Sequence, residues 1–147
     1  MSVNACLGRF FLTYITLTVG SGILLSLLRV ELSSVTNLVL ALILLLTAVW
    51  RACSLFGHKN HRYFTRVERR KVWLGMIAVN VAVHFLLLFS SMLLAGRWNA
   101  ELQAEATMRL VATSAICVLH VPFIWGVIVW IGKQFPNQPT ASPTLSA

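Results

Sequence analysis

Four long stretches without a charged side chain constrain this chain more than any other feature of its sequence. They are Phe10–Leu28, Val35–Trp50, Val72–Ala95 and Leu110–Ile131. A helix needs roughly 20 apolar residues to cross the ~30 Å hydrocarbon layer of a bilayer. Within lipid the backbone must satisfy its own hydrogen bonds, and these stretches lack the alternating pattern of a membrane β-barrel. We therefore expect an all-α, integral membrane antiparallel four-helix bundle.

The composition leads to the same fold class. Of the 147 residues, 58% are hydrophobic and 11% are charged, whereas soluble domains are about 45–50% apolar and about 25% charged. We expect one transmembrane domain over residues 1–134, with helices at about 10–28, 35–52, 72–95 and 100–133. The following tail, 135–147, is rich in Pro, Ser and Thr. That composition cannot bury a core, so we expect a disordered cytoplasmic tail.

The positions of lysine and arginine predict how the chain is oriented. The N-terminal segment, the loop 51–71 and the segment after residue 131 hold nine of them, and the other two connections hold three. By the positive-inside rule, both termini are then cytoplasmic. Because this rule explains the net charge of +8, we expect no nucleic-acid partner. In architecture the chain is similar to many small bacterial inner-membrane proteins, so we expect that membrane.

The loop 51–71 is the most polar segment and interleaves cations with aromatic residues. It either serves only to hold orientation or contacts anionic lipid head groups, where each cation contributes about 1 kcal/mol near the surface. The residues predicted to make such contacts are Arg62, Arg66, Arg69, Arg70 and Lys71. His58 and His61 are spaced like a metal pair but lack further ligands, so we expect no metal site.

Two polar stripes occupy the third and fourth stretches at bilayer depth. On the third stretch they are Asn80, His84 and Ser91, and on the fourth Thr113, Cys117 and His120. The helical period places the members of each set on one face. Both histidines lie near the middle of their stretches, and the helices are expected to run antiparallel. The two stripes can therefore face each other.

Three interpretations of the stripes remain open. In the first, neutral imidazoles form interhelical hydrogen bonds, which contribute only about 0.6 kcal/mol each in membranes but fix which faces meet. In the second, His84 and His120 are the axial ligands of a b-type haem held between facing helices. In the third, histidine carries protons along a transport path, although no intramembrane carboxylate accompanies it.

A row of small residues lies on the first stretch at every fourth position, at Thr18, Gly22 and Ser26. Such rows let helices approach closely. We expect this row to pack within the bundle, with oligomerisation through the same surface as the alternative. Ser33 or Ser34 is the expected N-cap of the second helix.

No nucleotide-binding loop, His-Glu-x-x-His motif or Ser/His/Asp set is present. The sequence thus favours a small multi-pass membrane protein without enzymatic activity. A partner, assembly, immunity or regulatory subunit acting through helix packing fits this description. It would contact the lipid bilayer and a protein partner or a second copy, and would need no cofactor. The alternatives are a redox subunit containing haem b and a small transporter or proton path.

Overall fold

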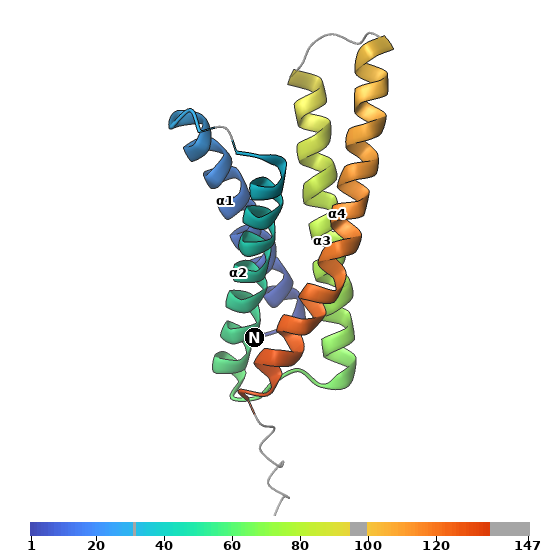
Figure 1. Ribbon diagram of the computed structural model, residues 1–147. Coiled ribbons are helices and arrows are strands. Elements are labelled where there is room, and N and C mark those ends of the chain that lie inside the picture. Colours follow the sequence, from blue (N-terminus) through green and yellow to red (C-terminus); the bar gives the residue numbers. More distant parts are fainter. Residues whose placement is uncertain (31, 95–99, 136–147) are drawn as a thin grey trace, which may run out of the picture.

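The computed structural model describes residues 1–30, 32–94 and 100–135. Within these residues the chain forms four α-helices that pack against one another (Figure 1). They are α1 (Val3–Leu27), α2 (Ser34–Asn60), α3 (Arg66–Leu94) and α4 (Ala100–Gly132). All four helices are long and apolar enough to span a membrane. The all-helical fold expected from the sequence is therefore confirmed.

The helices are not arranged around the bundle in chain order. α1 packs against α2 and α3, while α4 packs against α3 and α2. The consecutive helices α2 and α3 are thus diagonal, and residues 61–65 connect them across the lower end of the bundle in Figure 1. The upper halves of α1 and α2 diverge from those of α3 and α4 (Figure 1). As a consequence, the well-packed core lies in the lower half.

Three helices extend beyond the bounds that the sequence predicted for them. α1 begins at Val3 rather than near residue 10, and the Ser2 hydroxyl accepts the Ala5 N–H (3.2 Å) as an N-cap. α2 continues to Asn60 rather than 52, and α3 begins at Arg66 rather than 72. Hydropathy reports how much of a helix lies in hydrocarbon, whereas the helix itself ends only where a cap or turn stops it.

The start of α3 is fixed by a capping box. The Thr65 hydroxyl accepts the Glu68 N–H (3.3 Å), and the Glu68 carboxylate accepts the Thr65 N–H (2.9 Å), so two donors at the helix start are satisfied. The same carboxylate accepts hydrogen bonds from both terminal nitrogens of Arg62, at 2.7 and 2.9 Å. This pairing with Glu68 raises the pKa of Arg62.

The turn between α1 and α2 begins with a Schellman motif. Arg29 adopts a left-handed conformation with φ 51°. Its N–H donates to the Ser26 carbonyl (3.2 Å), and the Val30 N–H donates to the Leu25 carbonyl (3.1 Å), which closes the helix end. The Ser33 hydroxyl then accepts a first-turn N–H of α2 at 3.2 Å. One of the two expected N-caps is therefore confirmed.

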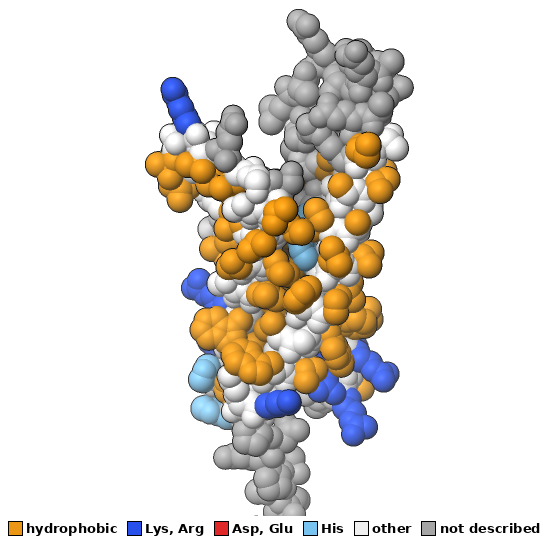
Figure 2. Space-filling model, viewed as in Figure 1, with side chains coloured by type: hydrophobic (Ala, Val, Ile, Leu, Met, Phe, Trp, Pro, Cys, Tyr) orange, Lys and Arg blue, Asp and Glu red, His pale blue; other side chains and the backbone are white. Residues whose placement is uncertain are grey.

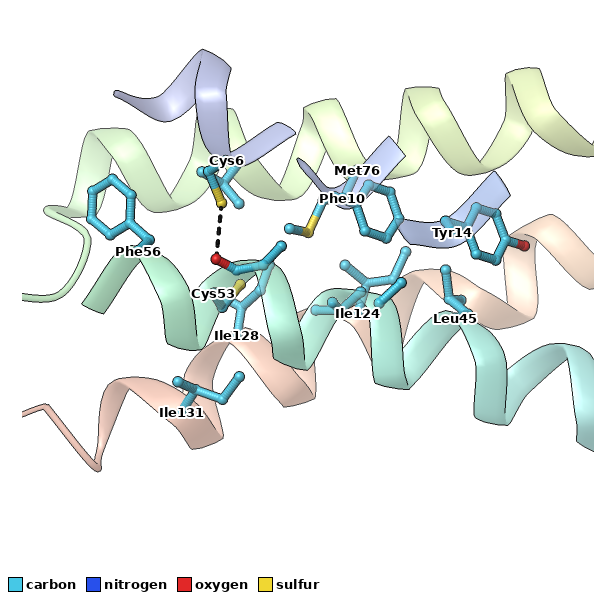
Figure 3. Packing of buried hydrophobic residues seen from close by; sticks show 14 of the residues in the cluster. Cys6, Phe10, Tyr14, Leu45, Cys53, Phe56, Met76, Ile124, Ile128 and Ile131 are labelled. Carbon is cyan, nitrogen blue, oxygen red and sulfur yellow. Dashed lines mark hydrogen bonds between the residues drawn. The ribbon is translucent and has the colours of Figure 1, made fainter. Parts of the chain in front are cut away.

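Apolar side chains from all four helices and the α2–α3 connection form the core (Figure 3). The Cys6 thiol of α1 donates to the Ala52 carbonyl of α2 at 3.5 Å. The α2–α3 connection contributes two buried aromatic residues, Tyr63 and Phe64. The Tyr63 hydroxyl donates to the Ile128 carbonyl of α4 at 2.6 Å. The connection therefore closes the lower end of the bundle.

The small-residue row of α1 does not make the close helix contact that we expected within the bundle. A Cβ added at Gly22 would meet no atom within 4 Å, because the helices diverge at this level. The close approach that we expected is therefore not made at Gly22. Close approaches occur elsewhere: an added Cβ would lie 2.6 Å from Leu7 at Gly75, and 2.8 Å from the Tyr63 ring at Gly132.

Candidate functional site

A hydrogen-bonded polar cluster joins α1, α3 and α4 near the middle of their lengths. It consists of Tyr14 from α1, Asn80 and His84 from α3, and His120 from α4. Asn80 and His84 are one turn apart, so both side chains leave the same face of α3. Three of the four are about 1% exposed, namely Tyr14, Asn80 and His120, whereas His84 is half-buried.

The carboxamide of Asn80 is the centre of the cluster. Its Oδ1 accepts a hydrogen bond from the Tyr14 hydroxyl at 3.0 Å, and His120 Nδ1 lies 3.3 Å from the same oxygen. A carboxamide oxygen only accepts, so His120 carries its proton on Nδ1. Its Nε2 then presents a lone pair.

His84 has the same protonation pattern. Its Nδ1 lies 3.0 Å from the backbone carbonyl of Asn80 and 3.4 Å from the Tyr14 hydroxyl. The carbonyl requires a donor, so His84 is also protonated on Nδ1. The rings of His84 and His120 meet edge to face, with centroids 5.5 Å apart and planes 65° apart. The structure thus brings the two predicted histidines into direct contact.

Two buried nitrogen atoms of the cluster have no hydrogen-bond partner within the described residues. They are Asn80 Nδ2, a donor, and His120 Nε2, which acts as an acceptor in this tautomer. An unpaired buried polar group costs about 1–3 kcal/mol. The cluster therefore holds its helices together while retaining one unused donor and one unused acceptor.

A partly open cavity of about 180 Å³ adjoins the cluster between α1, α2 and α3. His84 and Tyr14 lie at its cluster end, and Ser21 and Asn37 lie in the walls formed by α1 and α2. On the face drawn in Figure 2, an imidazole is visible among apolar side chains. The cavity is smaller than the ~300–1,000 Å³ of typical pockets for small molecules.

The remaining stripe residues contribute less to the cluster. Cys117 is buried on α4, one turn before His120, and Thr113 is half-buried one turn further from it. Neither takes part in the hydrogen bonds that connect the cluster across the described residues. The side chain of Ser91 lies outside the described part of the chain.

Tyr14 is the functional candidate that sequence reasoning missed. Its polarity was visible in the sequence, but nothing on the first stretch connected it with another group. In the sequence Tyr14 is only the fifth residue of the first stretch, where an interfacial tyrosine is usual, so its position gave no signal. Its place near the middle of α1 emerges only because the helix begins at Val3, and a buried tyrosine hydroxyl there needs a hydrogen-bond partner.

The predicted lipid-contact residues lie near the junction of α2 and α3. Arg62, Arg66, Arg70 and Lys71 are exposed, and Arg69 is half-buried. On the face drawn in Figure 2, Lys and Arg side chains gather toward the lower end, and apolar side chains cover the middle. Arg62 is held by Glu68, so the other four cations remain as candidates for contact with anions.

Within residues whose positions are described, no three His, Cys, Asp or Glu side chains are grouped to hold a metal ion. His58 instead packs edge-on against Phe135, with ring centroids 5.0 Å apart.

Comparison of the chain with family models, with curated proteins and with solved structures finds no match. Its function therefore has to be inferred from its own chemistry.

Proposed function

We propose that the chain is an integral membrane protein whose four helices cross the bilayer as an antiparallel bundle. Mean hydropathy over the spans is 1.8 to 2.2, and at most 28% of any spanning window is buried inside the protein. Apolar surface of that extent needs a lipid covering. The excess of cations near the α2–α3 junction supports cytoplasmic termini, and a bacterial inner membrane fits the chain.

We further propose that the protein is a non-enzymatic subunit that acts through helix packing. The observation that supports this role is the wall of the 180 Å³ cavity, where Ser21, Asn37 and His84 lie among apolar side chains. Polar residues at membrane depth face other helices or a cavity rather than lipid. Because the upper halves of the bundle diverge, a helix from a partner can cover these groups (Figure 1).

The central cluster supports the same role. Asn80 ties α3 to both α1 and α4 through Tyr14 and His120. In the hydrocarbon region such bonds fix which helix faces meet, although each contributes little energy. We therefore assign the cluster to positioning the diverging halves so that the cavity keeps one shape.

Photocrosslinking in cell membranes tests this proposal. A photoreactive residue replacing Leu25 or Leu40, both of which line the cavity, should give one product of defined mass. The matched control is Val118, which is 69% exposed on α4 and does not line the cavity. A product of twice the chain mass would identify a second copy as the partner. The same product from all three positions, or none from the cavity, contradicts the proposal.

A haem-binding subunit is the second candidate, and one observation favours it. Both imidazoles donate from Nδ1 to an oxygen of Asn80, His84 to its backbone carbonyl and His120 to its side-chain oxygen. Metal-bound imidazoles are commonly oriented by such a hydrogen bond from the nitrogen that does not bind the metal. The two rings are in contact, however, so a porphyrin would have to separate them. Haem ligation by His84 and His120 stays a prediction. A Soret band in the purified protein that is lost in both His→Ala variants would support it.

The transporter or proton-path alternative also stays a prediction. It requires that solvent reach His84 or His120 from both sides of the membrane. A proton-flux assay in proteoliposomes tests this alternative. His84→Ala and His120→Ala should each abolish flux if the path passes through the cluster. Unchanged flux in both variants would eliminate this alternative.

A further inference from the structure

A groove of about 430 Å³ lies between the lower parts of α3 and α4, and none of the four cluster residues lines it. Its walls are formed by Arg70, Trp73, Leu74, Val121, Pro122 and Trp125. Five of the six are apolar, and the sixth, Arg70, lies toward the start of α3. Leu74 is 59% exposed, so the groove opens toward the surroundings of the bundle rather than into its core.

Two indole rings shape the groove. Trp73 and Trp125 meet edge to face with centroids 5.4 Å apart. The Trp73 indole N–H points to the Val121 carbonyl at 3.5 Å, which uses the single donor of that ring. Pro122 contributes no N–H. The groove thus presents hydrocarbon and aromatic surface with few polar atoms.

One arginine, Arg70, lines the groove, and a second, Arg69, lies against the ring of its Trp125; within the described residues neither has an acidic partner. The guanidinium of Arg69 lies 5.4 Å from the centroid of the Trp125 ring. Its Nε is buried and has no hydrogen-bond partner within the described residues. The described chain contains one ion pair, between Arg62 and Glu68. Glu68 is therefore already engaged, and no carboxylate of the described residues compensates the charges of Arg69 and Arg70.

We propose that this groove binds one anionic phospholipid. The phosphodiester lies against Arg69 and Arg70, and one acyl chain follows the surface of Trp73, Pro122 and Trp125. A guanidinium matches phosphate oxygens with parallel N–H donors, and basic pockets between membrane helices on the cytoplasmic side bind anionic head groups. The inference rests on the proposed bilayer integration and adds a defined ligand site to it.

Quenching of tryptophan fluorescence by brominated lipids tests the proposal. A chain carrying Trp50→Phe, Trp98→Phe and Trp130→Phe retains tryptophan only in the groove. This chain is reconstituted in phosphatidylcholine vesicles containing increasing fractions of brominated phosphatidylglycerol or brominated phosphatidylcholine. We expect half-maximal quenching at a several-fold lower fraction of phosphatidylglycerol.

Arginine variants show whether the preference comes from the groove. Arg69→Gln with Arg70→Gln should reduce the preference to that for phosphatidylcholine. The matched control, Arg66→Gln with Lys71→Gln, removes the same charge from the same end of α3 but outside the groove, and should keep the preference. A preference that survives in the Arg69/Arg70 variant, or disappears equally in the control, overturns the proposal.

Two further outcomes separate the possible causes of failure. Equal quenching by both lipids in the parent chain overturns the groove site but leaves bilayer integration intact. Absence of quenching by either lipid overturns the site and bilayer integration together. Inorganic phosphate added to the vesicles should leave the preference unchanged. If phosphate alone abolishes it, the arginines bind a free anion and the acyl chain has no role.

Discussion

The carboxamide of Asn80 is located where three helices meet, and side chains of the other two helices bond to its oxygen. The sequence predicted the depth and mutual approach of His84 and His120, because both lie near the middle of their apolar stretches. It did not predict the central role of Asn80 or the participation of Tyr14. Helical periodicity places a residue on a face of its own helix, whereas a bond between three helices depends on how those helices pack.

Replacing Asn80 with leucine should destabilise the bundle by about 1–3 kcal/mol, because the Tyr14 hydroxyl and the His120 N–H both lose their buried acceptor. The free energy of unfolding in mixed detergent micelles measures the change. Asn37→Leu is the matched control, since the Asn37 side chain is exposed and its Nδ2 donates to the Leu32 carbonyl at 3.4 Å. Equal effects of the two substitutions would show that the cluster does not hold the helices together.

Arg29 adopts a left-handed conformation that glycine adopts without steric cost. Arg29→Gly should therefore stabilise the protein by about 1 kcal/mol. Arg29→Val removes the same charge but introduces a β-branched side chain, and should destabilise it. The difference between the two variants in the same unfolding measurement isolates the backbone term. Equal free energies of unfolding for the two variants would mean that residue 29 leaves the left-handed conformation without cost.

At the scale of the helices, apolar stretches located the four membrane-length elements but not where they end. Their termini are set by local devices such as the Thr65–Glu68 capping box and the Schellman turn at Arg29. Hydropathy does not register these devices, because they consist of single hydrogen bonds and one unusual φ angle.

Close contact between α4 and the α2–α3 connection is expected to tolerate no added methyl group. Gly132→Ala would place a Cβ 2.8 Å from the Tyr63 ring. It should therefore displace this ring from its bond to Ile128 and destabilise the protein by about 1–3 kcal/mol. Gly126→Ala is the control in the same helix. Its Cβ meets no atom within 4 Å, so a gain of up to about 1 kcal/mol is expected. Thermal unfolding in detergent measures both, and a neutral Gly132→Ala would contradict the contact.

For the whole molecule, the sequence indicated lipid as the solvent but not the order of helices around the bundle. The diagonal placement of α2 and α3 leaves no trace in hydropathy, since all four stretches are similarly apolar. The 180 Å³ cavity arises because the helix pairs diverge, and hydropathy did not predict it either. The small-residue row of α1 even suggested the opposite, because small side chains permit a close approach without enforcing it.

Reporter fusions test the proposed orientation of the whole chain. A reporter active only in the cytoplasm should be active when fused after residue 147 or within residues 61–65, and inactive when inserted near residue 30. A reporter active only outside the cytoplasm should give the reverse pattern. The reason is the distribution of cations between alternate connections. Activity of the second reporter after residue 147 would contradict both the topology and the matched depths of His84 and His120.

The buried position of the α2–α3 connection has a consequence for biosynthesis. Tyr63 binds a carbonyl of α4, the helix that is translated last of the four. Until that helix inserts, the Tyr63 hydroxyl lacks this acceptor and its ring lacks the α4 surface against which it is buried. The aromatic pair Tyr63 and Phe64 therefore takes its buried position only after the last helix has docked.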